Sequence, residues 1–160
     1  MPTVAVPPQV PRVLRLTRTI LLVVALALVL SACVTPALNA ADYRDKALGS
    51  AEAATSEVGT AKLVCGLLLR ERVLQSTADE TLGASEDALG SISDSLLAVQ
   101  PPRGADPIYL RLATQLDRAE SAVRDARIAA RRSDTDALVD LVGRMDTILA
   151  DLAATEELLA

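Results

Sequence analysis

Apolar residues recur at spacings of three and four along most of this chain, and this pattern constrains the fold more than any other feature. No proline occurs from residue 37 to residue 100, so a helix can continue through that stretch. Spacings of three and four place the apolar side chains on one face of an α-helix, where they can pack against a partner helix. Because no segment after residue 36 shows the sustained alternation of a strand, the sequence predicts an all-α fold.

The apolar positions fall into four registers. Leucine and alanine dominate them, and the chain contains two tyrosines but no phenylalanine or tryptophan, which predicts a light core. In chain order the registers are Tyr43, Ala47, Ala51, Ala54, Val58, Ala61, Cys65 and Leu68; Leu82, Leu89, Ile92, Leu96 and Val99; Tyr109, Leu112, Leu116, Ala119, Val123, Ala126 and Ala130; and Leu138, Leu141, Met145, Ile148, Leu152 and Leu159.

Two of the breaks between helices are marked clearly. Residues 100–107 contain three prolines and a glycine, which cannot continue a helix, and Asp106 before Pro107 is typical of an N-cap followed by proline at the first helical position. In residues 131–136 the basic pair Arg131 and Arg132 suits a helix C-terminus, and Ser133 or Asp134 can cap the helix that follows.

A third break, near residues 74–79, is marked less clearly. Thr77 and Glu80 have the spacing of a capping box, and Glu71 and Gln75 would place polar groups on the apolar register. Against a turn, Leu68 and Leu82 keep the same heptad phase and the region has no glycine or proline. We expect an antiparallel four-helix bundle with helices near 38–74, 78–99, 107–131 and 135–159. The alternative is three helices, of which the first is unbroken and about 90 Å long.

Six glycines lie inside the expected helices, where each costs about 1 kcal/mol relative to alanine. They are Gly49, Gly59, Gly66, Gly83, Gly90 and Gly143. We interpret them as places of close helix packing or as simple tolerance; a bend or a gap that admits a ligand is the alternative.

The first 33 residues have the layout of a secretory signal peptide. Arg12, Arg15 and Arg18 precede a run of eleven apolar residues, 20–30, and no acidic residue occurs before Asp42. The run is shorter than the approximately 20 apolar residues that an uncleaved transmembrane anchor needs.

The segment Leu30-Ser31-Ala32-Cys33 resembles the lipobox of bacterial lipoproteins. The resemblance covers residues 1–33 and implies that Cys33 receives a diacylglyceryl group, that cleavage falls between Ala32 and Cys33, and that two acyl chains anchor the protein to the extracytoplasmic face of the cell membrane. The chain then divides into a signal peptide (1–32), a lipidated tether (33–37) and a helical bundle (38–160). Ordinary secretion and a retained anchor are the alternatives.

Charge and cysteine content narrow the function. Residues 33–160 carry 13 basic and all 21 acidic residues, a formal charge of −8, which argues against nucleic acid as a partner. If Cys33 is lipidated, Cys65 has no intramolecular disulfide partner. We expect Cys65 to behave as a small buried hydrophobe; an intermolecular disulfide or a reactive thiol is the alternative.

The sequence offers no catalytic, metal-binding or cofactor-binding residues that we would assign. It has no histidine, no glycine-rich phosphate loop and no nucleophile elbow. We interpret its paired carboxylates as solvated helix surface rather than as a cation site: Asp79-Glu80, Glu86-Asp87, Asp134 with Asp136, and Glu156-Glu157. Charges of alternating sign between residues 117 and 127 predict an exposed helix face with intrahelical ion pairs.

These observations favour a non-enzymatic, lipid-anchored envelope protein that acts through contacts with an envelope protein, and a homo-oligomer could also complete the bundle. A lipoprotein that binds a small ligand or substrate between its helices is the alternative. An exposed apolar strip would favour protein contacts, whereas a cavity with buried polar groups would favour a ligand.

Overall fold

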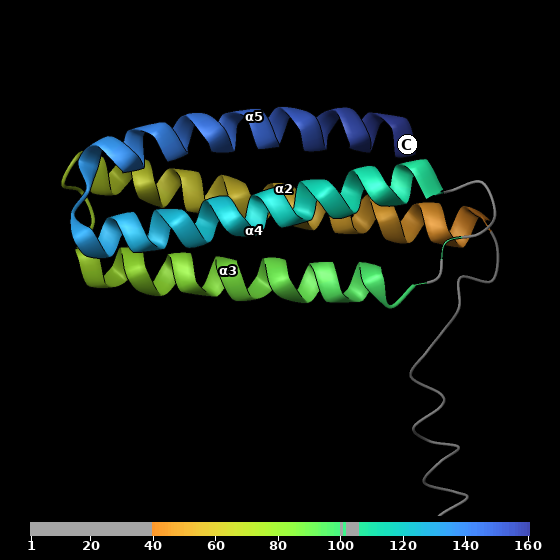
Figure 1. The fold of residues 1–160 in the computed structure, drawn as a ribbon, viewed down its shortest axis with the longest axis horizontal. Coiled ribbons are helices and arrows are strands. Elements are labelled where there is room, and N and C mark those ends of the chain that lie inside the picture. The colour runs from red at the N-terminus through yellow and green to blue at the C-terminus, as the bar shows by residue number, and fades with distance from the viewer. Residues whose placement is uncertain (1–39, 100, 102–105) are drawn as a thin grey trace, which may run out of the picture. The chain divides into compact units, whose positions relative to one another are not determined.

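The computed structural model of the chain describes residues 40–99, 101 and 106–160. This part contains four α-helices and no strand, which confirms the all-α prediction and the four-helix bundle (Figure 1). The helices are α2 (Ala40–Leu69), α3 (Gln75–Leu97), α4 (Asp106–Arg132) and α5 (Thr135–Leu159).

Consecutive helices run antiparallel. The α2–α3 and α4–α5 connections lie at one end of the bundle, and the start of α2, the end of α3, the start of α4 and the C-terminus lie at the other (Figure 1). Every helix therefore packs against its neighbour in sequence, and α5 closes the bundle against α2. This is the up-down-up-down arrangement that short connections favour.

The bundle has a diamond-shaped cross-section. Helix α2 contacts the diagonally opposite α4 as well as α3 and α5, whereas no described residue of α3 comes within 8 Å of α5 between Cα atoms. Small buried side chains allow the approach of α2 and α4. Among the described residues, nine of the 17 that these two helices bury are alanines, which let two helices come close together. Helix α5 mainly buries leucines and other large side chains, and α3 buries three leucines together with Ala78, Gly83 and Ser85.

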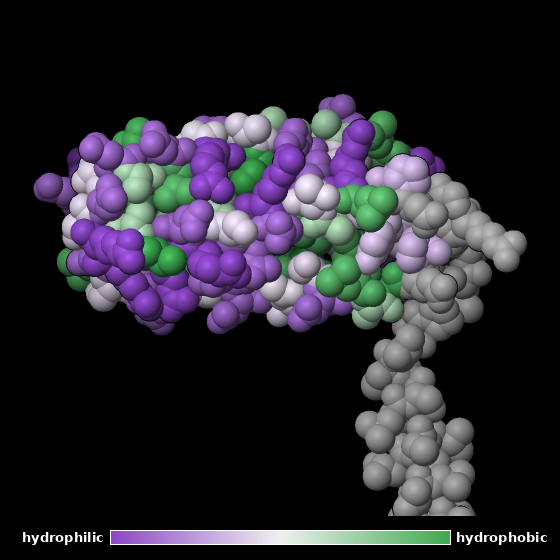
Figure 2. All heavy atoms as spheres, in the orientation of Figure 1, coloured by the Kyte–Doolittle hydropathy of each residue, from purple (hydrophilic) through white to green (hydrophobic). Residues whose placement is uncertain are grey.

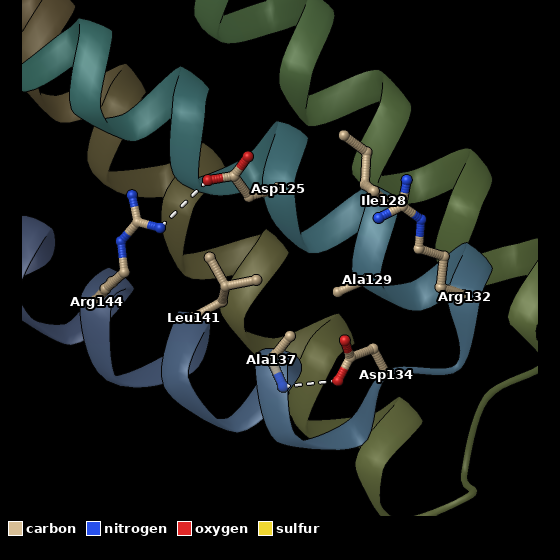
Figure 3. Close-up of a pocket in the computed structure, with 8 residues that line it drawn as sticks. All are labelled: Asp125, Ile128, Ala129, Arg132, Asp134, Ala137, Leu141 and Arg144. Carbon is tan, nitrogen blue, oxygen red and sulfur yellow. Dashed lines mark hydrogen bonds and ion pairs between the residues drawn. The ribbon is translucent and has the colours of Figure 1, made fainter.

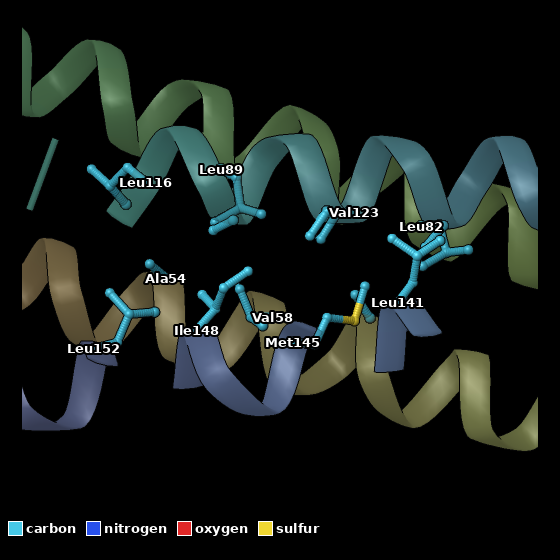
Figure 4. Close-up of a cluster of buried hydrophobic side chains, with 14 of the residues drawn as sticks. Ala54, Val58, Leu82, Leu89, Leu116, Val123, Leu141, Met145, Ile148 and Leu152 are labelled. Carbon is cyan, nitrogen blue, oxygen red and sulfur yellow. The ribbon is translucent and has the colours of Figure 1, made fainter. Parts of the chain in front are cut away.

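The core follows the predicted registers. Seven of the eight predicted α2 positions are buried, the exception being Leu68, and all six predicted α5 positions are buried. Ile92, Val99 and Tyr109 are partly buried at the margin of the same cluster. Side chains from all four helices point toward one another in the middle of the bundle (Figure 4). Among the described glycines, only Gly83 has neighbouring atoms near the position of an added Cβ, and the others face open space.

The first turn lies earlier than predicted. Helix α2 ends at Leu69 rather than near 74, and α3 begins at Gln75 rather than at 78, so the alternative of one unbroken first helix is wrong. The end of α2 is a Schellman motif: the amide of Glu71 donates to the Leu68 carbonyl (3.0 Å) and the amide of Arg72 to the Leu67 carbonyl (2.8 Å). Glu71 adopts φ 55°, the left-handed conformation that usually takes glycine.

The proposed capping box at Thr77 and Glu80 does not start α3. The N-cap is Leu74, whose side chain offers no hydrogen bond. Instead, Gln75 ties this end of the bundle together, because its side-chain amide donates to the carbonyls of Ala130 (2.7 Å) and Arg131 (3.1 Å) at the end of α4. These carbonyls are among the groups that a helix C-terminus leaves without intrahelical partners.

The second turn forms as the sequence predicts. Helix α4 ends at Arg132, and the Asp134 carboxylate accepts a hydrogen bond from the Ala137 amide (3.1 Å), which caps α5. Ser133 repeats the Schellman geometry with φ 54°, its amide donating to the Ala130 carbonyl (3.1 Å). Both turns at this end of the bundle therefore place a residue other than glycine in the left-handed region.

Because a left-handed conformation costs a residue with a Cβ about 1–2 kcal/mol, we expect Glu71→Gly to raise the free energy of unfolding by about 1 kcal/mol. Urea denaturation followed by circular dichroism measures the change. Ala84→Gly, at an exposed position inside α3, is the matched control and should lower stability by about 1 kcal/mol. A loss of stability in both variants would contradict the assigned turn geometry.

Candidate functional site

The residues predicted to carry lipidation and cleavage lie outside the described part of the chain. These residues are Leu30, Ser31, Ala32 and Cys33. Within the described part, no helix combines the length and apolar character required to cross a bilayer.

A groove follows the seam between α4 and α5. It consists of three adjoining depressions of about 290, 310 and 530 Å³. Arg144 lines the first and second, and Arg118 and Asp151 line the second and third, so the depressions form one continuous surface that we call the α4–α5 groove. Figure 3 shows the part nearest the α4–α5 turn, which is lined by Ile128 and Arg132 of α4 and by Ala137, Leu141 and Arg144 of α5.

The groove combines a buried apolar floor with exposed apolar side chains. Leu141 and Ile148 of α5 form part of the floor and are almost fully buried. Ile128 and Leu110 of α4 line the groove and expose 41% and 62% of their surface. Figure 2 shows apolar patches among the charged side chains of this face. Apolar groups with this exposure gain free energy when a partner covers them.

Four arginines line the groove. On α4, Arg118 follows Arg111 by seven residues and Arg132 follows Arg118 by fourteen. Asp125 occupies the position halfway between Arg118 and Arg132, and Arg144 of α5 donates a hydrogen bond to it (3.2 Å; Figure 3). Arg118 lies 3.8 Å from the Asp151 carboxylate, and both side chains are about half exposed or more. Arg111 and Arg132 make no ion pair or side-chain hydrogen bond with any described residue.

A buried polar pair lies beside the third depression. The Thr155 hydroxyl is within hydrogen-bonding distance of the Gln115 Oε1 atom (3.0 Å), and the Gln115 side-chain amide donates to the Asp151 carbonyl (2.8 Å). Both residues are more than nine-tenths buried. Gln115 and Thr155 each continue an apolar register, three residues after Leu112 and Leu152. The periodicity therefore indicates that both positions are buried, although both side chains are polar. The pair fixes the register of α4 against α5, because sliding would leave buried polar groups unsatisfied.

The seam between α3 and α4 has a different character. Arg127 of α4 lies across α3 at Gly83 and donates to Asp79 (3.0 Å) and Glu86 (3.1 Å), one turn to either side. A Cβ at position 83 would lie 3.1 Å from the Arg127 guanidinium carbon, so the glycine makes room for this side chain. This bears out the close-packing interpretation at one glycine.

Further ion pairs extend this cluster along the same seam. Arg131 donates to both carboxylate oxygens of Asp79 (2.6 and 3.0 Å), and Arg124 contacts Glu86 and Glu120. Hydrogen bonds from Arg131 and Arg127 lower the pKa of Asp79 below its ordinary value. The expected intrahelical pairing is therefore correct only for Arg124 with Glu120, and the other pairs join different helices.

The Cys65 thiol and the grouping of carboxylates are the remaining candidate chemical features in the described part of the chain. Cys65 is fully buried, and burial raises the pKa of its thiol to about 11, as expected for a small buried hydrophobe rather than a reactive thiol. Among the residues that the structure describes, no three His, Cys, Asp or Glu side chains gather where they could hold a metal ion.

The two glycines of α3 allow a matched test of the Arg127 contact. Gly90→Ala should raise the free energy of unfolding by about 1 kcal/mol, because alanine favours the helix and meets no neighbour. Gly83→Ala should raise it less, or lower it, because the new methyl group displaces the Arg127 guanidinium. Thermal and urea denaturation measure both changes. In an Arg127→Ala background the two substitutions should become equivalent; a persistent difference would show that Arg127 is not the cause.

Comparison with protein-family models, with curated proteins and with solved structures finds no match for this chain.

Proposed function

We propose that this chain is a bacterial lipoprotein whose helical domain acts as a non-enzymatic protein-interaction module at the extracytoplasmic face of the cell membrane. The lipobox resemblance at Leu30-Ser31-Ala32-Cys33 supports the anchor, since two acyl chains on Cys33 give stable membrane attachment. With a formal charge of −8 on residues 33–160, attraction to anionic head groups adds nothing to this anchoring.

The composition of the α4–α5 groove is the observation that supports the proposed binding of a protein. Arginine is enriched at protein interfaces, where its planar guanidinium makes several hydrogen bonds at once. The groove offers Arg111 and Arg132 without partners in the described chain, next to the exposed Leu110 and Ile128. Exposed apolar groups flanked by free arginines fit a helical, acidic segment of a protein.

One observation favours the alternative of a lipoprotein that binds a small apolar ligand. A depression of about 370 Å³ lies between α2 and α5, where Gly59 and Gly66 leave space and Leu63, 63% exposed, lines the wall. Its volume is within the range of small-molecule sites. Its polar lining consists of Lys62 and Arg70, and Lys62 already pairs with Asp146.

The anchor is tested by expressing the full chain in a bacterium and measuring intact mass and membrane fractionation. We expect a membrane-bound species that begins at Cys33 and carries a diacylglyceryl mass increment. Cys33→Ala should abolish both properties, whereas Cys65→Ala, which removes the other cysteine, should retain them. A soluble species cut elsewhere and unchanged by Cys33→Ala would disprove the lipoprotein assignment.

The interaction is tested in the same cells with a photo-crosslinking amino acid. Placed at Ile128 in the α4–α5 groove, it should yield a covalent adduct with a protein. Placed at Ser56, an exposed α2 residue outside the groove, it should yield none. Equal yields at the two positions would contradict the groove as an interface, and a small-molecule adduct from Leu63 alone would favour the alternative function.

A further inference from the structure

Helix α3 presents an acidic stripe to solvent. Among the described residues it packs only against α2 and α4, so its outward face has no partner within the bundle. Glu80, Asp87 and Asp94 are exposed on this face at intervals of seven residues. None of their carboxylates makes an ion pair or side-chain hydrogen bond with any described residue. We call these three residues the α3 stripe.

The side chains of α3 on either side of the stripe are short. The exposed residues beside the carboxylates have small side chains: Thr77, Ala84, Ser91 and Ser95. At the end of the helix Leu97 exposes 57% of its surface. A helix face of small residues can lie deep in a groove, where its backbone approaches the groove wall, and an apolar residue at one end can cover an apolar patch there.

The α4–α5 groove carries an excess of positive charge, with four arginines against Asp125, Asp134 and Asp151, and its arginines recur at the same interval. Arg111, Arg118 and Arg132 follow the heptad positions of α4, and Arg144 occupies the step at Asp125. Seven residues of α-helix rise about 10.5 Å, so carboxylates on one helix and arginines along the other meet at every step. The charges on each surface are exposed, and the two outer arginines have no partner in the described chain.

We propose that the α4–α5 groove binds the α3 stripe of a second copy of this chain, so that the protein associates with itself. This inference rests on the proposed use of the groove as an interface and names its partner. Both complementary surfaces belong to this chain, so no other protein is required to explain either of them. Attachment to one membrane raises the local concentration of copies and favours the association.

The spacing restricts the register. The groove has four arginine steps and the stripe has three carboxylates, so full engagement uses three consecutive steps. The middle carboxylate, Asp87, then faces one of the two middle arginines, Arg118 or Arg144, whichever way the helix runs. The Asp151 carboxylate near Arg118 does not prevent this, because a guanidinium can bind two carboxylates.

The association is head-to-tail. The stripe lies on α3 and the groove on the seam of α4 with α5, and α3 and α5 do not contact each other in the described bundle. Each copy therefore offers a groove to one neighbour and a stripe to another. Such heterologous contacts generate rings or open arrays rather than a closed pair.

Cysteine crosslinking of the full chain in bacterial membranes tests the contact. One variant combines Asp87→Cys with Arg118→Cys and another combines Asp87→Cys with Arg144→Cys. A short bismaleimide should convert at least one of them into a ladder of dimers, trimers and larger species. Each single variant, the unmodified chain with its buried Cys65, and Asp87→Cys combined with Ser56→Cys should give no ladder.

Charge exchange tests the electrostatic basis without cysteines. With the photo-crosslinker at Ile128, Asp87→Arg should lower the yield of the adduct of twice the chain mass about tenfold, because like charges then meet in the groove. Adding Arg118→Asp or Arg144→Asp should restore the yield. Glu52→Arg, which reverses an exposed charge on α2 outside the stripe, should leave it unchanged.

Absence of a ladder in both double variants would overturn self-association, and so would a charge exchange that fails to restore the yield. Ile128 adducts formed only with a different protein would also overturn it, while leaving the proposed interaction function intact. Conversely, if Cys33→Ala leaves fractionation unchanged, the anchor fails, and a crosslinked ladder still supports self-association.

Discussion

The close approach of α2 and α4 determines the shape of this bundle. Alanine side chains at Ala51, Ala54, Ala122 and Ala126 are fully buried and occupy little space between the two helices. Within the described part of the chain, helices α3 and α5 make no such contact with each other, which gives the bundle its diamond-shaped section. This packing leaves α3 without a neighbour on its outer side and gives α4 and α5 a seam whose surface is the groove.

Alanine seams contribute little buried apolar area, so the remaining contacts carry more of the stability and specificity. Leucines and Met145 supply most of the large buried side chains. The hydrogen-bonded pair of Gln115 and Thr155 opposes sliding of α4 against α5, and Arg127 over Gly83 does the same for α4 against α3. Each seam that α4 shares with a neighbour in sequence thus has at least one buried or part-buried polar contact that selects a register among otherwise similar alanine and leucine surfaces.

Local features of the sequence were sufficient to predict the helices and their buried faces, because spacings of three and four report directly on which side of a helix is apolar. The predicted position of the first turn was wrong because Glu71 adopts a left-handed conformation. Glycine usually occupies such a position, and without it the sequence does not indicate where α2 ends. The groove and the seam contacts could not be predicted in this way. They join residues from different helices, such as Arg144 with Asp125, and depend on rotations and relative heights that no single helix encodes.

The distribution of charge, rather than its sum, distinguishes the surfaces of this domain. The net charge of −8 on residues 33–160 describes an acidic protein, yet arginines concentrate on α4, where they serve two different seams. Toward α3, Arg124, Arg127 and Arg131 are neutralised by carboxylates of the same bundle. Toward α5, four arginines meet two paired aspartates and the carboxylate that caps α5, so positive charge is left over. An acidic chain with one basic groove contains both halves of an electrostatic contact, and copies held at the same membrane bring these halves within reach of each other.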